Sequence, residues 1–287
     1  MALTERQTGG EFKLYHYDPT VAGATIFSIL FAISTFYHLW QMIRTRAWLT
    51  LPLIAGGFLE IIGYIARGVS GSESPNWTLG PYIIQAIFLL VAPALFAASI
   101  YMEFGRIVTG LQAEHHTFMR ITWITKIFVT GDVISFLLQG GGGGYQSSGT
   151  AEALSTGTDI IIVGLFVQLL FFGFFIGVAG AWHYRMLCLP PSRAYFLPWK
   201  KHVYTLFGTS MLIMVRSVFR VIEYLQGNNG YILSREAFLY VFDAMLMLAV
   251  MATLHFVHPS EVLSFLKKRQ EGRDTLDLQL EGNYQAI

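Results

Sequence analysis

The sequence predicts an all-α polytopic membrane protein, a bundle of seven transmembrane helices, from three observations. Hydrophobic residues make up 54% of the chain and charged residues only 13%, against about 25% charged in soluble proteins. Seven separate stretches have the roughly 20 apolar residues that a helix needs to cross a hydrocarbon core about 30 Å thick. Basic residues gather in alternate connections between these stretches. Together these features exclude a soluble domain, which could not bury so much apolar surface.

The predicted spans divide the chain into three parts. Residues 1–20 form an extracellular N-terminal segment, residues 21–257 the membrane domain, and residues 258–287 a cytosolic end with a short amphipathic helix at 260–269 and a disordered tail. The connections are too short to hold a soluble domain. The predicted spans are residues 21–43, 48–68, 81–107, 121–139, 159–187, 202–225 and 236–257.

Orientation follows from the distribution of arginine and lysine. The first, third and fifth connections and the tail carry the basic set, so they are predicted to be cytosolic and the N-terminus to lie outside. The sequon Asn76-Trp77-Thr78 then falls on the outer face, three residues before Pro81. Glycosylation of Asn76 is left open, because this site is so near the membrane. The run Gly140–Gly144 is expected to leave the fourth helix as a hinge, a lid or a plain linker.

Several classes of function lack their sequence signals. The net charge is +1 and no basic cluster lies outside the tail, so no nucleic-acid partner is predicted. One cysteine, Cys188, cannot form an intramolecular disulfide or a multi-cysteine metal site. No G-x-x-x-x-G-K pattern occurs, so the glycine run is not expected to bind a nucleotide. No cofactor and no catalytic residue is predicted.

Polar side chains inside the spans recur on single helix faces. A charge at mid-bilayer costs at least about 2.5–3.5 kcal/mol on insertion scales, so such residues are candidates for function. The second span has them at i, i+4 and i+7, the fourth at i, i+3 and i+7, and the sixth at i, i+4 and i+7. In order, these sets are Glu60, Tyr64 and Arg67; Asp132, Ser135 and Gln139; and Arg216, Arg220 and Glu223; the seventh span adds a stripe of Asp243, Met247, Met251 and His255.

These groups are predicted to share one layer in the middle and outer half of the membrane, where four acids meet three bases. That near balance suits either a hydrated substrate cavity or a buried network that only fixes helix packing. The methionine stripe below Asp243 allows the same two interpretations, a polarizable slot wall or a core filler.

A second set lies toward the cytosol or in the fifth span. Glu103 and Arg106, at i and i+3, are expected to form an ion pair, with Lys126 opposite. His255 and His258 have a spacing compatible with metal ligation, but interfacial histidines need no metal, so no metal site is predicted. Gly173 and Gly177 form a small-xxx-small pair that would allow homodimerisation.

The sequence resembles the RTA-like, or lipid-translocating exporter, family of fungal seven-helix proteins over roughly residues 15–265. The motifs that carry the resemblance are Glu60-Ile-Ile-Gly-Tyr64 with Arg67, Ala97-Ala-Ser-Ile-Tyr-Met-Glu103, Thr125-Lys-Ile-Phe-Val-Thr-Gly-Asp132, Gln139-Gly-Gly-Gly, Gly164-Leu-Phe-Val-Gln168, Arg216-Ser-Val-Phe-Arg220, Glu223-Tyr224, Glu236, Tyr240, Asp243-Ala and His258-Pro259. The resemblance implies export or tolerance of amphipathic molecules such as sphingoid long-chain bases and sterol-like amines, with porphyrin handling in some relatives, and it supplies no catalytic residue.

We therefore expect a membrane translocator whose partners are membrane lipids and an amphipathic small molecule, with the plasma membrane as the expected site and vacuolar or endoplasmic reticulum membranes as alternatives. A protonated amine would pair with Glu60, Asp132 or Asp243, and Glu60 or Asp132 would carry the proton in any coupled transport. Two other functions are considered: a receptor-like lipid sensor, and a zinc-dependent lipid amidohydrolase that would need three converging histidines and a carboxylate.

Overall fold

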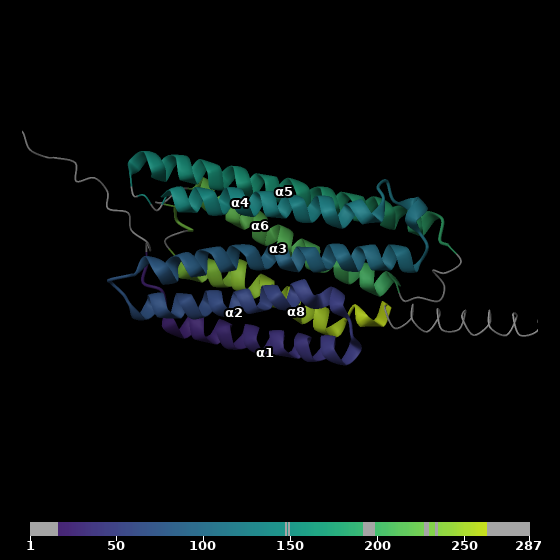
Figure 1. The fold of residues 1–287 in the computed structure, drawn as a ribbon, viewed down its shortest axis with the longest axis horizontal. Coiled ribbons are helices and arrows are strands. Elements are labelled where there is room, and N and C mark those ends of the chain that lie inside the picture. Colours follow the sequence, from purple (N-terminus) through teal and green to yellow (C-terminus); the bar gives the residue numbers. More distant parts are fainter. Residues whose placement is uncertain are drawn as a thin grey trace, which may run out of the picture.

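The computed structural model is an all-helical bundle, as the sequence predicts (Figure 1). It describes residues 17–146, 148, 150–191, 199–226, 230–232 and 235–262. Within these ranges seven helical segments are long and apolar enough to cross a membrane. They are α1 (Val21–Thr45), α2 (Leu51–Ser72), α3 (Leu79–Gly110), α4 (Ile121–Gln146), α5 (Ala151–Cys188), α6 (Trp199–Leu225) and the composite of α7 (Glu236–Leu239), η4 (Tyr240–Ala244) and α8 (Met245–Phe256).

Local sequence explains several helix ends. Arg46 ends α1 in the left-handed conformation, with φ 54°. A 3₁₀ turn, η1 (Trp48–Thr50), then leads into α2, where a proline occupies the first turn and so loses no intrahelical bond. The Thr150 side chain caps α5 by accepting a hydrogen bond from the backbone N–H of Ala153 at 3.2 Å.

The expectation of a loop at Gly140–Gly144 was wrong, because α4 continues through all five glycines to Gln146. Close approach to α5 explains one of them. A Cβ on Gly142 would lie 2.7 Å from the carbonyl oxygen of Gly157 and 2.8 Å from the side chain of Ile161. Glycine at this position therefore lets the two backbones meet, in the manner of small-residue contacts in membrane bundles.

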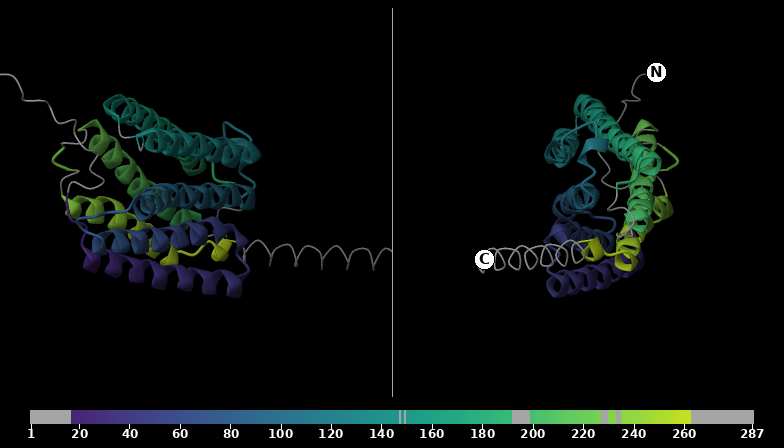
Figure 2. Two further views of the ribbon diagram at one scale, coloured as in Figure 1. Left: turned by 60° about the vertical axis from the view of Figure 1, so that its left-hand side comes forward. Right: turned by 90° about the vertical axis from the view of Figure 1, so that its right-hand side faces the viewer.

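The bundle has two recognisable parts. α4 and α5 run side by side along most of their length, while α1, α2, α3 and α8 form a second group (Figure 2). α6 packs against both parts through its contacts with α5, α8 and α3. Aromatic side chains fill the space between α3, α4 and α5, where the ring of Phe175 lies within 6 Å of Tyr101, Phe104 and Phe128.

The connections alternate between two ends of the bundle. Residues 17–20, 73–78, 148, 150, 230–232 and 235 lie at one end, which we call the N-terminal end. The opposite end, the C-terminal end, holds residues 46–47, 111–120 and 257–262, including the 3₁₀ turn η2 (Glu114–His116). Which end faces the cytosol stays a prediction. Most of the predicted N-terminal segment, and residues 263–287 with the greater part of the predicted amphipathic helix and tail, lie outside the described residues.

The sequon lies in the tight turn between α2 and α3. Asn76 is exposed there, and both the hydroxyl and the backbone N–H of Thr78 donate to Oε2 of Glu73, at 2.7 and 2.9 Å. These hydrogen bonds to the ionised carboxylate lower the pKa of Glu73.

Candidate functional site

The centre of the polar site is an ion pair between α6 and the seventh span. Nε of Arg216 donates to Oδ1 of Asp243, and both side chains are buried. Nη2 of Arg216 donates in addition to the backbone carbonyl of Leu89 on α3, at 2.8 Å. One guanidinium thus joins three helical segments.

The Leu89 carbonyl is available because of a proline one turn later. Pro93 lies inside α3 and has no N–H to donate to the carbonyl four residues before it, which is that of Leu89. In a membrane interior a freed carbonyl needs another partner, and Arg216 supplies it. The sequence contains the signal for this contact, a proline in the middle of an apolar span, although the partner is not readable from it.

The backbone of the seventh span is irregular where it carries Asp243. Residues Tyr240–Ala244 form η4, a π-helical turn, between α7 and α8. A π turn holds an extra residue relative to an α-helix and changes the direction of the side chains after it. Asp243 lies in this turn, where it reaches Arg216.

Glu60 on α2 is the second acid of this group. Its side chain is 1% exposed, and it lies close enough to Asp243 and Arg216 for electrostatic interaction. Within the described part of the chain, its buried Oε2 has no hydrogen-bond partner. Two carboxyl groups therefore share a single guanidinium, which is already bonded to Asp243.

Tyr64 lies one helical turn after Glu60 on the same face of α2. Its ring stacks on Phe31 of α1 at 5.5 Å between centroids and lies 6.2 Å from Tyr240. The Tyr64 hydroxyl is buried and finds no partner among the described residues. A buried hydroxyl without a partner normally costs about 1–3 kcal/mol, so Glu60 and Tyr64 together present polar atoms that packing alone does not explain.

Arg67 belongs to a separate cluster at the N-terminal end. Its Nη2 donates to Oε1 of Glu236 at 2.7 Å and to the hydroxyl of Tyr17 at 2.8 Å, and its Nε to the hydroxyl of Tyr240 at 3.2 Å. The Glu236 carboxylate also accepts the backbone N–H of Thr20. Burial raises the pKa of Tyr17, and the positive charge of Arg67 acts in the opposite direction. This cluster fastens the start of α1 to α2 and α7.

The remaining predicted members of the layer have their hydrogen-bond partners outside the group around Glu60. Arg220 and Glu223 pair with each other along α6, at 2.8 Å. Asp132 accepts a hydrogen bond from the hydroxyl of Tyr101 at 3.1 Å, in the interface between α3 and α4. The single charged layer expected from the sequence is thus several groups in different interfaces. These groups also include three residues that were not among the predicted site residues, Tyr17, Tyr101 and Glu236.

Neutral hydrogen bonds connect α4 to α5. The hydroxyl of Ser135 donates to the backbone carbonyl of Gly164 at 2.7 Å. The side-chain amide of Gln139 donates to Ser135 and to Gln168, at 2.6 and 3.2 Å. Gln139, predicted as a member of the polar layer, is buried between these two helices.

Glu103 has a different partner from the expected one. Arg106 and Lys126 are both exposed, whereas Glu103 is buried with its Oε1 3.4 Å from Nδ1 of His202. The opposite ring nitrogen of His202 lies 3.3 Å from Glu261. The i, i+3 spacing suggested a pair on one helix, but Glu103 and Arg106 face different environments, one the core and one the surface.

The histidines of the seventh span pack on one another and on neighbouring polar atoms. The ring of His255 stacks on His38 of α1 at 3.8 Å between centroids and lies within hydrogen-bond distance of Ser34. Nδ1 of His258 lies 2.8 Å from the hydroxyl of Ser260. Among the residues that the structure describes, no three histidine, cysteine, aspartate or glutamate side chains are arranged to hold a metal ion.

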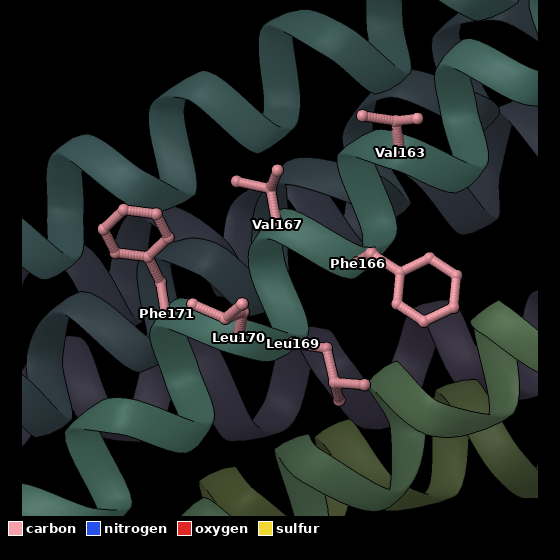
Figure 3. Close-up of a pocket in the computed structure, with 6 residues that line it drawn as sticks. All are labelled: Val163, Phe166, Val167, Leu169, Leu170 and Phe171. Atoms are coloured by element: carbon pink, nitrogen blue, oxygen red, sulfur yellow. The ribbon is translucent and has the colours of Figure 1, made fainter.

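The methionines below Asp243 are part of the core, since Met247 and Met251 are both fully buried. A surface hollow of about 510 Å³ lies on α5, where it is lined by Val163, Phe166, Val167, Leu169, Leu170 and Phe171 (Figure 3). Its lining is apolar, and Leu170 is 71% exposed.

A Cβ on Gly177, one turn beyond Gly173, would meet no atom within 4 Å, and homodimerisation through these glycines stays a prediction.

Comparison with known proteins identifies the family. The family model described as "RTA1 like protein" matches residues 53–265. The chain belongs to this family. It is 38% identical to Protoporphyrin uptake protein 1 of Saccharomyces cerevisiae, covering 85% of this chain and 91% of that protein. Protein RTA1 of the same yeast is 34% identical, with 94% and 95% covered.

A more distant relative is the Sphingoid long-chain base transporter RSB1 of Saccharomyces cerevisiae, 24% identical over 80% of this chain and 69% of that protein. No solved structure matches the chain. Its membership of the RTA1-like family and its seven apolar helices make it an integral membrane protein. The resemblance recognised from the sequence motifs is confirmed.

Proposed function

We propose that this RTA1-like protein translocates amphipathic molecules with a cationic head group, such as sphingoid long-chain bases or other lipophilic amines, across its membrane. The observation that carries the proposal is the buried carboxyl group of Glu60, whose Oε2 has no hydrogen-bond partner within the described ranges, while the neighbouring Arg216 is bonded to Asp243. Support comes also from relatives named as a sphingoid base transporter and a probable lipid transporter.

The chemistry of the group around Glu60 fits an ammonium head group. Arg216 neutralises Asp243, so an ionised Glu60 would leave a net negative charge in the apolar core, which is strongly unfavourable unless a cation joins it. The hydroxyl of Tyr64 lies one helical turn away and offers a further acceptor for an ammonium or a donor to a cargo hydroxyl. The hydrocarbon chain of such a cargo would remain among apolar side chains.

Flux through purified protein in liposomes tests this function. We expect radiolabelled dihydrosphingosine to cross protein-containing vesicles at least ten times faster than protein-free vesicles. Glu60→Gln, which keeps the shape and removes the charge, should abolish most of this flux. Glu152→Gln, at an exposed carboxylate in the first turn of α5, should retain it.

The outcomes separate the alternatives. Absence of wild-type flux for every amphiphile tested overturns the translocator function, and saturable lipid binding without flux would favour the receptor-like sensor. Protoporphyrin IX, which carries two carboxylates, serves as a test cargo with the opposite charge. Its transport in preference to the amine would contradict the role given to Glu60.

A further inference from the structure

The group around Glu60 has an unequal number of acids and bases. Arg216 uses its Nε on Asp243 and its Nη2 on the Leu89 carbonyl. Its charge is therefore offset by Asp243, and its donors are directed toward α3 and η4. Glu60 is the surplus acid, and in a site shielded from water it needs either a proton or a second cation.

Among the residues that the structure describes, the surroundings of Glu60 supply no such second cation. Arg216 comes from α6, Asp243 from η4, and Tyr64 from α2 itself. Arg220, which also interacts with Asp243, is paired with Glu223, and Arg67 is bonded to Glu236. The side chains that α1 and α3 bring to this face include Phe31, stacked on Tyr64, and Leu89, packed against Gly63.

We propose that Glu60 is an exchange site that holds either a proton or the cationic head group of the cargo, so that the protein exchanges one ammonium cargo for one proton. This inference rests on the proposed function and adds its driving force. When the cargo enters from one side, the Glu60 carboxyl releases its proton to the water on that side and forms an ion pair with the ammonium. On the opposite side the cargo leaves, and the carboxylate takes up a proton from that water.

The exchange conserves charge inside the membrane. Protonated Glu60, ionised Asp243 and Arg216 sum to zero. Ionised Glu60 with a bound ammonium, beside the same pair, also sums to zero. Neither state therefore places a net charge in the low-dielectric core, and a complete cycle moves no net charge across the bilayer.

Two irregular helix segments lie next to the exchange site. Pro93 interrupts the hydrogen bonding of α3 one turn beyond Leu89, and η4 interrupts that of the seventh span at Asp243. Prolines and π turns are the places where membrane helices bend, and both segments are bonded to Arg216. Bending there would open the buried Glu60 to one end of the bundle or the other.

Asp132 is a less suitable exchange site. Its carboxylate already accepts the hydroxyl of Tyr101, and the neighbouring rings of Phe128 and Phe175 pack around Tyr101. The π turn and Arg216 belong to other interfaces. We assign the proton to Glu60 and not to Asp132.

The first experiment measures the driving force with wild-type protein in liposomes and radiolabelled dihydrosphingosine, subtracting the uptake of protein-free vesicles. An interior one pH unit more acidic than the exterior should give about tenfold accumulation, because one proton is exchanged for each cargo molecule. A potassium diffusion potential set with valinomycin should leave the flux unchanged. Flux that responds to the potential and not to the pH gradient would overturn the exchange, although the translocator function would survive.

The second experiment follows the proton directly. Infrared difference spectra of detergent-solubilised protein, recorded as dihydrosphingosine binds, should show loss of the C=O band of a protonated carboxyl group. Glu60→Gln should remove this signal, Glu60→Asp should keep it, and Glu152→Gln should not alter it. Binding with no carboxyl change in the wild type would contradict the proposal, and this readout does not depend on the variants folding.

Discussion

Two regions of the bundle differ in the polar contacts that hold their helices together. Around α2, α3, α6 and the seventh span the contacts are charged, with Arg216 bonded to Asp243 and Arg67 to Glu236. Between α4 and α5 they are neutral, with Ser135, Gln139 and Gln168 in one chain of hydrogen bonds and Gly142 against Gly157. The charged part buries ionised side chains that helix packing does not require. The α4–α5 part uses neutral contacts, which cost less free energy in lipid.

This difference indicates a division of roles. Glycine contacts and neutral hydrogen bonds bring two membrane helices close without placing charge in the membrane. Buried ion pairs add little net stability over well-packed apolar residues, so their presence beside Glu60 is better explained by a site than by packing. We expect α4 and α5 to act as the firm support and the charged part to carry the working groups.

The largest expected effect is at the central ion pair. Arg216→Met leaves the Asp243 charge and the Leu89 carbonyl without their partner, and loss of one member of a buried pair costs about 3–5 kcal/mol. Adding Asp243→Leu should recover a large part of this loss, because the uncompensated charge is gone. Unfolding by SDS titration from mild detergent measures both. A double variant no more stable than Arg216→Met alone would contradict this view of the pair.

The second effect lies in the neutral part and uses two glycines of the same run. Gly142→Ala places a Cβ 2.7 Å from the Gly157 carbonyl oxygen, and overpacking of this kind costs about 1–3 kcal/mol. Gly143→Ala is the matched control, because a Cβ there meets no atom within 4 Å. In a helix this second change should stabilise by about 0.5–1 kcal/mol. Equal effects of the two substitutions in thermal unfolding would show that α4 and α5 do not meet at Gly142.

The helix count and the family were predictable, because length, apolar composition and separated motifs are properties of the sequence itself. The end of α4 was not. Five consecutive glycines have low helix propensity in water, but backbone groups in lipid must bond within their own helix, and α4 therefore continues to Gln146.

The candidate site was predicted as a set of residues and not as a set of contacts. Helix periodicity places Glu60, Tyr64 and Arg67 on one face of α2, and all three are buried. It does not give the rotation of one helix against another, which decides that Asp132 meets Tyr101 and that Glu103 meets His202. The expected depth in the membrane therefore placed in one group several acids that lie in different helix interfaces.

The smallest expected effect tests whether each neutral hydrogen bond between α4 and α5 contributes little to stability. Ser135→Ala removes the hydroxyl that donates to the Gly164 carbonyl and accepts from Gln139. Hydrogen bonds between membrane helices average about 0.6 kcal/mol, so SDS titration should show a loss several times smaller than that of Arg216→Met. Ser155→Ala, at an exposed position of α5, should cause a smaller loss still. A cost for Ser135→Ala close to that of Arg216→Met would remove the distinction between the two parts, because the neutral contacts would then be as essential to folding as the charged ones.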